Sequence, residues 1–561
     1  MSLEEISSLR QDAAELLLKW ARALAPHYGV SGSMDLDLID FPDAEGPSYY
    51  NQFTHYAYLL LSEGVVPGAT AQEREVFRQI ALKNIQSVLD MTDDQFHTPH
   101  YSRGRDWGRH IGEWLNYYLL CSLHVMQTHC VSDEIFRAKV AHVIQGAVGQ
   151  LVDRFRQRFA DAPVKFPGNH ATWYGLLFYR AGLFFDRADW VVFARDFFAR
   201  YIVPTQRSNG VWPEGDGIVV NYSMVTAQAV SLYAEASGDQ DALMSMERAL
   251  GFFKYFSLPD GSSAVAADCR MRYHARPFVF MPPSFLRCAQ GRQVCQDRVR
   301  SFCTLLDSTT LSDNAAQSLA FYSSFVDFLF EQEVADDSLT EKEPQELPVA
   351  RVSQGDWTGF LSWQLTPENP SRFILDTQNF LEVYHAASGY LIGAGNSKYM
   401  PRFSTVRQKN KGRSYIPDQA ICKVQSENQV TCVYSFGSDQ VQVSLSFEQA
   451  ACVVRFCVLT PSTDAVYEAG IMLAFHSDEH ISIGDDVISV LPVALINRTF
   501  RELCQSFVWR ERLFDVPEGA VLDYPLIPHN PYTQNGLPAA EEYIARLSFQ
   551  ITHEEKTVTI R

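Results

Sequence analysis

The chain has 561 residues, 46% of them apolar, and a formal net charge of −19 at pH 7. This length and apolar content are enough for more than one buried core. The negative charge argues against general nucleic-acid binding and against non-specific binding to anionic membranes, because both need a basic surface. It remains compatible with an anionic substrate if the binding cleft is locally basic.

Helices are predicted over about the first 330 residues, where apolar residues recur at spacings of three and four. The predicted segments are 4–26, 48–63, 71–91, 108–128, 132–160, 169–186, 188–204, 219–237, 239–257, 277–288, 291–306 and 313–332. Twelve helices in hairpin pairs are what a toroid of six helical hairpins requires. An open helical solenoid is the alternative, although no repeat of fixed period is present.

The periodicity changes after an acidic segment. Residues 333–349 are rich in carboxylates and Pro and are predicted to be a linker. Beyond it, short runs rich in β-branched and aromatic residues alternate with Gly, Asn, Asp or Pro, which is typical of antiparallel strands. We therefore predict a multidomain α-then-β chain: an (α/α)6 toroid over 1–332, the linker, and a large antiparallel β-sandwich domain over 350–561.

The 11 cysteines contain no CxxC pair and no spacing with histidine partners in zinc-site order. Scattered cysteines are typical of a reducing compartment. The first residues lack a basic segment followed by an apolar run, and no apolar stretch is long enough for a transmembrane helix. We therefore expect no metal, no cofactor, no disulfide framework, no membrane association and a cytoplasmic location.

Two junctions between a loop and a helix carry the candidate catalytic residues. In PGNHATWY (167–174), Asn169 is predicted to cap a helix, with His170 on its first turn. An amide, an imidazole and a helix N-terminus can together hold a carboxylate. In the second junction, Asn221 and Tyr222 are predicted to open the next helix. The alternative is structural: the two asparagines cap their helices, His170 is satisfied and partly buried, and Tyr222 packs on its helix.

Two clusters of Arg and His lie in predicted loops, at 103–110 and 270–276. Guanidinium groups bind carboxylate or sulfate in a bidentate manner, so both clusters are candidate substrate sites. In the alternative interpretation the basic groups pair with carboxylates of the protein itself: Asp106, Glu113 and Asp268.

The architecture and these motifs resemble the heparinase II/III-like and oligo-alginate lyase superfamily of polysaccharide lyases. GNHATWY and the later NYS are similar to its catalytic motif in order and spacing, and residues 375–399 are similar to the start of its second domain. Many members bind zinc there near a Gly-Asp-His sequence. This chain has His385 in that region but lacks that sequence, so we expect no metal.

The resemblance implies a lyase that cleaves a uronic-acid-containing glycan by β-elimination. In that chemistry the uronate carboxylate is neutralised, a base removes the C5 proton, and the bond to the 4-oxygen breaks. Asn169 and His170 would neutralise the carboxylate, Tyr222 would act as base or acid, and His274 would be a second acid/base candidate. The candidate substrate-binding residues are Arg105, Trp107, Trp173, Trp212, Glu214, Arg272, Tyr273 and His385.

Other functions remain open at this point. A glycoside hydrolase on the same scaffold would use two carboxylates, and the candidates are Asp106, Glu113, Glu214 and Asp216. A uronate epimerase would share the proton abstraction. A non-catalytic sugar-binding or scaffold protein would leave Asn169, Tyr222 and His274 scattered. The expected partner is an anionic oligosaccharide or polysaccharide, and formation of a homo-oligomer is left open.

Overall fold

The computed structural model forms two compact units, which are described separately. The helical unit comprises Met1–Pro213, Asn221–Lys254 and Pro277–Pro344, and the sheet unit comprises Glu214–Val220, Tyr255–Arg276 and Gln345–Arg561. The structure describes residues 3–29, 52–102, 105–106, 112–215, 217–270, 279–308, 313–331, 338–365, 369–393, 397–398, 400–448, 450–460, 465–475, 479–491, 495–501, 505–531, 533 and 535–561.

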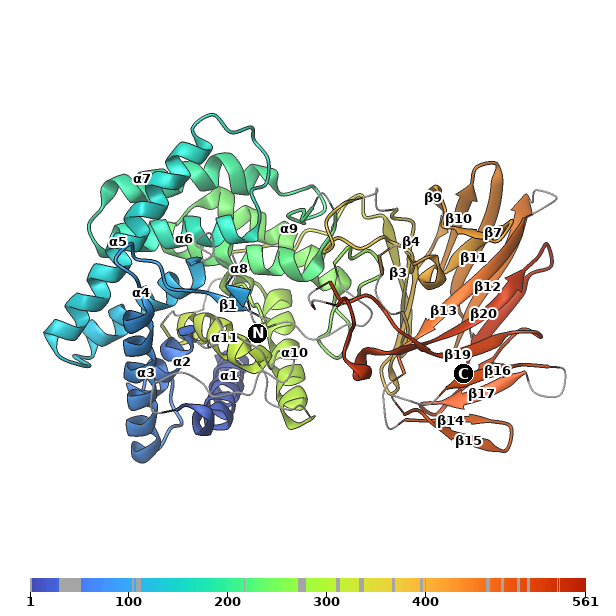
Figure 1. Ribbon diagram of the computed structural model, residues 1–561, viewed down its shortest axis with the longest axis horizontal. Helices are drawn as coiled ribbons and strands as arrows, with labels where there is room; N and C mark the ends of the chain where they lie inside the picture. Colours follow the sequence, from blue (N-terminus) through green and yellow to red (C-terminus); the bar gives the residue numbers. More distant parts are fainter. Residues whose placement is uncertain are drawn as a thin grey trace. The chain divides into compact units, whose positions relative to one another are not determined.

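Eleven α-helices precede the two large sheets in the part of the chain that the structure describes (Figure 1). They are α1 (Leu3–Leu24), α2 (His55–Ser62), α3 (Ala71–Met91), α4 (Glu113–Thr128), α5 (Glu134–Phe159), α6 (Asn169–Phe184), α7 (Ala188–Phe197), α8 (Val220–Ser237), α9 (Gln240–Phe256), α10 (Ala289–Ser308) and α11 (Asp313–Glu331). A π-helical segment, Phe198–Ile202, continues α7. The predicted helix 277–288 is wrong in type: its described part holds the 3-10 helix Pro283–Arg287. Two consecutive prolines, Pro282 and Pro283, supply no N–H there for an α-helical ladder.

The helices alternate between an inner and an outer position. The inner helices α2, α4, α6, α8 and α11 are buried on nearly every side, and all eight residues of α2 are buried. The outer helices keep a polar, exposed face: α1, α3, α5, α7, α9 and α10. A helix that is apolar all round belongs inside a protein, whereas an amphipathic helix covers one.

The inner helices α6 and α8 run parallel. The indole N–H of Trp173 donates to the carbonyl of Val225 at 3.0 Å, and the hydroxyl of Tyr179 donates to the carbonyl of Ala236 at 3.4 Å. The contacts thus advance along both helices in the same direction. Parallel inner helices are what consecutive helical hairpins produce when they are arranged in a ring.

The ring closes around an aromatic centre. Helix α1 packs on α10 and α11, α11 packs on α2, α2 on α4, and α4 on α6. The side-chain amide of Gln228 on α8 donates to the carbonyl of Phe321 on α11 at 3.1 Å, which closes the ring. The ring of Phe321 on α11 lies 5.0 Å from that of Trp114, 6.0 Å from that of Trp173 and 4.5 Å from that of Phe280. The predicted toroid is therefore confirmed, and side chains fill its axis.

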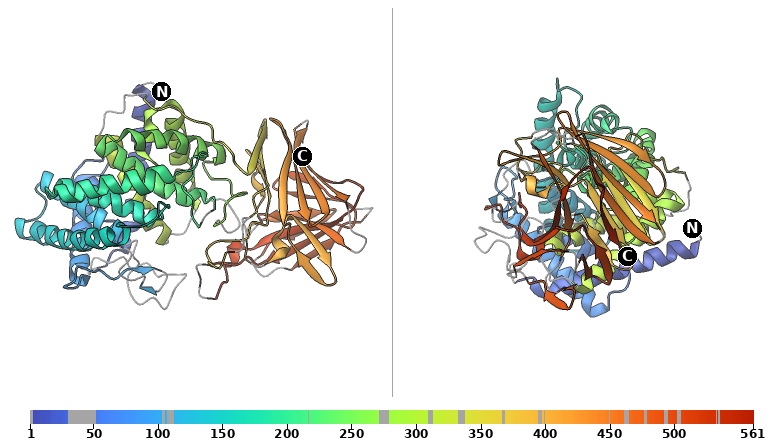
Figure 2. Two further views of the ribbon diagram at one scale, coloured as in Figure 1. Left: turned by 90° about the horizontal axis from the view of Figure 1, so that it is seen from above. Right: turned by 90° about the vertical axis from the view of Figure 1, so that its right-hand side faces the viewer.

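The sheet unit contains two antiparallel sheets that face each other (Figures 1 and 2). The nine-stranded sheet has the order β15 (Asp486–Ser489), β14 (His480–Ile483), β17 (Ser506–Trp509), β18 (Arg512–Asp515), β21 (Lys556–Ile560), β12 (Ala451–Thr460), β11 (Asp439–Glu448), β10 (Gln429–Phe436), β9 (Gln419–Gln425). The ten-stranded sheet has the order β16 (Ile496–Thr499), β19 (Val521–Leu526), β20 (Ile544–Ile551), β13 (Val466–Leu473), β6 (Gly389–Ile392), β5 (Leu381–His385), β4 (Trp357–Ser362), β3 (Val349–Gln354). Strand β7 (Val406–Asn410) pairs with β13, and β8 (Arg413–Tyr415) pairs with β7.

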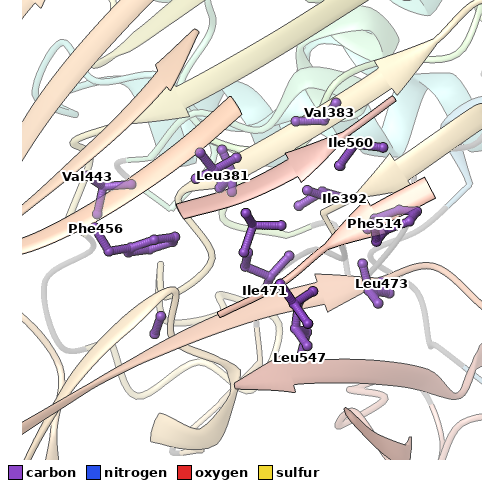
Figure 3. Packing of buried hydrophobic residues seen from close by; sticks show 14 of the residues in the cluster. Leu381, Val383, Ile392, Val443, Phe456, Ile471, Leu473, Phe514, Leu547 and Ile560 are labelled. Atoms are coloured by element: carbon purple, nitrogen blue, oxygen red, sulfur yellow. The ribbon is translucent and has the colours of Figure 1, made fainter. Parts of the chain in front are cut away.

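Alternating apolar residues build the core between the sheets. On β11 and β12, Val443 lies opposite Phe456 and Leu445 lies opposite Val454, and all four side chains are buried. Side chains of the other sheet, such as Leu547, meet them in one cluster (Figure 3). Burying each such side chain contributes about 1.5–3 kcal/mol. The predicted antiparallel sandwich is therefore confirmed.

The predicted linker belongs in part to the helical unit. The backbone N–H of Lys342 donates to the carbonyl of Glu247 on α9 at 3.2 Å, and Lys254 pairs with Glu341 at 2.7 Å. The first strand, β3, begins at Val349. Residues 332–337 lie outside the described part. Among the helices that the structure describes, none is long and apolar enough to cross a membrane.

Candidate functional site

Three helices of the helical unit begin at the same end of the toroid. Helix α4 is parallel to α6, because Glu113 pairs with His170 at their first turns and the rings of Tyr117 and Trp173 lie 5.4 Å apart one turn later. Helix α6 is in turn parallel to α8. The N-terminal ends of α4, α6 and α8 therefore point the same way. Helix N-termini carry partial positive charge and bind anions.

Helix α6 begins with a glycine cap. Gly168 is the N-cap residue at φ 101°, and Asn169 is the first helical residue. The prediction that Asn169 caps the helix is thus wrong by one position, because glycine adopts a positive φ that other residues avoid. Asn169 is only 2% exposed. Its amide is a polar group buried in the first turn of the helix.

His170 and Glu113 form a pair that joins α6 to α4. The His170 side chain is 39% exposed, whereas the Glu113 side chain is fully buried. Burial alone would raise the pKa of the Glu113 carboxyl. The charge of His170, its hydrogen bond and backbone N–H groups, including that of Gly112 at 3.0 Å, outweigh burial and lower that pKa. The buried carboxylate therefore holds the imidazole in place through this contact.

Tyr174, one turn further along α6, lies below this pair. It is 3% exposed, and burial followed by the charge of Glu113 raises the pKa of its phenol well above the usual value. His100 is also buried, at 3%. Both side chains lie near Gly112, where an added Cβ would be 3.3 Å from the His100 ring and 3.8 Å from the Tyr174 hydroxyl. Tyr174 keeps its proton at neutral pH.

Tyr222 lies in the first turn of α8, which begins at Val220, one residue after the predicted start. Its side chain is half-buried, and the preceding Asn221 is 7% exposed. The hydrogen bond from the Trp173 indole to the Val225 carbonyl joins α6 to α8. Tyr222 lies less than one turn before Val225 on α8, and Asn169 lies about one turn before Trp173 on α6. At 1.5 Å per residue, each lies within about 6 Å of that contact along its own helix axis.

Two predicted substrate-binding tryptophans lie in the core instead. Trp173 is 0% exposed, and its indole N–H is bonded to Val225. Trp212 is 1% exposed, and its indole N–H donates to the carbonyl of Ile202 at 2.9 Å. Protein atoms cover both faces of these rings, so the two tryptophans hold the scaffold and cannot stack on a sugar.

Two other predicted substrate residues lie in the sheet unit. Glu214 accepts a hydrogen bond from Arg270 at 2.9 Å. His385 on β5 is 5% exposed, packs edge-to-face on Trp357 at 4.5 Å, and accepts the N–H of Ala387 at Nδ1. Burial and then the charge of Arg512 lower the pKa of His385. These contacts give His385 a structural role at the end of β5.

Several predicted residues lie outside the described part of the chain: Trp107, Asp216, Arg272, Tyr273 and His274. Arg105 and Asp106 form the short strand β2, which pairs with β1 (Tyr101–Ser102), but their side chains are also outside the described part.

Asp268, another predicted partner of the basic clusters, accepts the backbone N–H groups of Val220 and Arg270 at 2.7 Å each. Within the described ranges, no group of three or more His, Cys, Asp or Glu could hold a metal ion.

The sequence interpretation missed the role of Glu113. It appeared there as a hydrolase carboxylate or as a partner of the basic clusters, whereas the structure pairs it with His170. Their separation of 57 positions in the sequence hides this contact, because it depends on the parallel packing of two inner helices.

Comparison with known proteins gives no family match: no family model and no curated protein matches this sequence. Among solved structures, the Streptomyces coelicolor A3 chondroitin AC lyase in complex with chondroitin sulphate is 12% identical, with a TM-score of 0.49, over 98% of this chain and 79% of that one. A chondroitinase AC lyase is 9% identical, with a TM-score of 0.47, over 99% and 82%. An unsaturated glucuronyl hydrolase from Streptococcus agalactiae is 10% identical, with a TM-score of 0.38, over 59% and 93%.

Proposed function

We propose that this protein is a lyase that cleaves a uronic-acid-containing oligosaccharide or polysaccharide by β-elimination. The observation that carries the proposal is the shared direction of α4, α6 and α8, with Asn169, His170 and Tyr222 in the first turns of α6 and α8. The short motifs that resemble the heparinase II/III-like superfamily support the same chemistry.

The carboxylate of the substrate is the group that these helix starts would hold. Helix N-termini, the Asn169 amide and a charged His170 each stabilise negative charge. During proton removal that charge grows on the carboxylate as an enolate-like intermediate forms, so preorganised donors stabilise the transition state more than the ground state. Glu113 contributes as a positioning residue that holds His170.

Tyr222 would remove the proton. Its deprotonated oxygen takes the C5 proton, the C5–H electrons form a C4–C5 double bond, and the C4–O bond breaks. The departing oxygen then takes a proton, and Tyr222, once protonated, can supply it. Tyr174 is a poor alternative because burial and Glu113 raise the pKa of its phenol. His274 stays a second acid/base candidate by sequence alone.

The hydrolase alternative needs two carboxylates that reach the substrate. Glu113 is fully buried and bound to His170, and Glu214 holds Arg270. These are the two hydrolase candidates whose side chains the structure describes, and both are already engaged. No observation favours the hydrolase over the lyase.

The test is a panel of uronate polysaccharides and oligosaccharides, with and without sulfate, incubated with the full-length protein. Elimination creates a double bond conjugated with the carboxylate, which absorbs ultraviolet light. We expect a steady rise in absorbance with at least one member and none with a neutral glucan. Release of reducing sugar without that absorbance would replace the lyase by the hydrolase.

A further inference from the structure

A cluster of cations surrounds an aromatic ring in the sheet unit. The guanidinium carbon of Arg372 lies 4.8 Å from the centre of the Phe373 ring, and that of Arg270 lies 5.2 Å from it. Both distances are within the range of cation–π attraction. The two positive charges are consequently no more than about 10 Å apart. Like charges this close repel unless an anion lies near them.

Backbone hydrogen bonds hold the segments that carry this cluster. The N–H of Cys269 donates to the carbonyl of Ile218 at 2.9 Å, and the N–H of Leu375 donates to the carbonyl of Cys269 at 2.7 Å. The N–H of Asp376 donates in turn to the carbonyl of Ser397 at 3.0 Å. Segments far apart in the sequence are thus joined edge to edge. The cluster is built into the sheet unit and does not depend on one loop.

The carboxylates around the ring leave one cation unbalanced. Arg270 pairs with Glu214 at 2.9 Å, and Lys398 lies 3.8 Å from Asp376. Arg372 is exposed and forms no ion pair with any residue in the described ranges. Its charge therefore faces solvent in a protein whose net charge is −19.

The pKa of His529 reflects the same excess of positive charge. Burial lowers the pKa of its imidazole, and the charges of Arg372 and Lys398 lower it further. Its backbone N–H donates to the hydroxyl oxygen of Ser397 at 3.4 Å, which ties it to the joined segments. A cationic side chain, a half-buried aromatic ring and a neutral imidazole thus share one surface.

We propose that Arg372, whose guanidinium lies over the ring of Phe373, forms a subsite for an anionic sugar unit. The guanidinium of Arg372 binds the carboxylate or sulfate of that unit, because its planar fork matches both groups. This subsite rests on the proposed function in one respect, since it takes an anionic oligosaccharide as its ligand.

The test is calorimetric titration of the full-length protein with three tetrasaccharides: an unsulfated uronate, a sulfated uronate and a neutral glucan. Arg372→Ala should weaken binding of a charged ligand about 10- to 100-fold, the worth of one or two charged hydrogen bonds. If Arg372→Ala binds both charged ligands more weakly, Arg372 binds the carboxylate. If only the sulfated ligand binds more weakly, Arg372 binds the sulfate. The control is Arg413→Ala on β8, which removes the same charge from an exposed position.

Two outcomes would overturn the subsite: equal affinity of wild type and Arg372→Ala for the charged ligands, or no binding of these ligands by the wild type. The lyase assignment is judged separately by turnover. Charged ligands that bind through Arg372 but are never cleaved would support the subsite and remove the lyase.

Discussion

The residue that most sharply separates chemistry from binding is Tyr222. We expect Tyr222→Phe to lower kcat by about 100- to 10,000-fold, the usual contribution of a positioned acid or base. Substrate affinity should change far less, because the proton moves only in the transition state. Steady-state kinetics and equilibrium binding on one uronate substrate provide both numbers.

The matched control for that variant is Tyr174→Phe. It removes the same hydroxyl from a buried tyrosine on α6 whose raised pKa makes it a poor base. If the two variants lose turnover equally, the hydroxyl of Tyr222 has no special part in proton transfer.

Single residues also show what a sequence can reveal. The starts of α6 and α8 follow from local pattern, and both helices begin within one residue of the predicted positions. The burial of Trp173 and Trp212 does not follow, because each depends on a carbonyl of another segment, Val225 and Ile202. An aromatic residue at the start of a helix or in a loop looks the same in sequence whether it packs inward or faces a ligand.

At the scale of elements, β5 holds a loop of the sheet unit through one buried carboxyl. Glu382 is 1% exposed and accepts the backbone N–H groups of Val265 and Ala266 at 2.8 and 2.7 Å. Burial raises the pKa of this carboxyl from 4.5 to about 7, although these bonds oppose the shift. Its contribution to stability is complete below pH 4.5 and is lost as pH rises through about 7.

We therefore expect Glu382→Gln, which keeps an acceptor without the charge, to gain stability relative to wild type as pH rises. The relative gain between about pH 4.5 and 8 should approach 3 kcal/mol, about 1.4 kcal/mol for each unit of pKa shift. Denaturant unfolding across this range measures it. The exposed control Glu427→Gln should show no such trend, and a difference for Glu382→Gln that does not vary with pH would contradict the buried-carboxyl argument.

A second prediction at this scale concerns the stability effect of filling a glycine on α9. The segment after α11 crosses α9 at Gly251. A Cβ at Gly251 would lie 1.7 Å from the carbonyl oxygen of Lys342. Gly251→Ala should therefore destabilise the protein by about 1–3 kcal/mol, the usual cost of overpacking. Thermal unfolding measures this loss.

The control is a glycine in α5 that has room. A Cβ at Gly149 would meet only the Trp190 ring, at an ordinary 3.6 Å. Gly149→Ala should be neutral or stabilising by up to about 1 kcal/mol, because alanine is the better helix former. Equal stability of the two variants would show that the segment does not press on α9.

At the scale of the whole molecule, the change in the spacing of apolar residues after residue 332 predicts a helical domain followed by a β-domain. Helices α1–α11 come before it and the sandwich comes after it, because apolar spacing reports which face each element buries. Which segments belong to which unit could not be predicted in the same way. Segments Glu214–Val220 and Tyr255–Arg276 lie among the helices in sequence, and include the first residue of α8 and the last two of α9, yet belong to the sheet unit. They belong to the sheet unit because of backbone hydrogen bonds, such as the one from the N–H of Leu375 to the carbonyl of Cys269. Such bonds leave no periodic pattern of apolar residues in the sequence.

The proposed reaction breaks a C–O bond by elimination, without adding water. The most direct measurement is mass spectrometry of the products formed from a uronate oligosaccharide in water enriched in the heavy oxygen isotope. We expect fragments whose masses sum to that of the substrate, one with a C4–C5 double bond and none with the heavy isotope. Fragments that together exceed the substrate by one water, with the heavy isotope in the new hydroxyl, would contradict it.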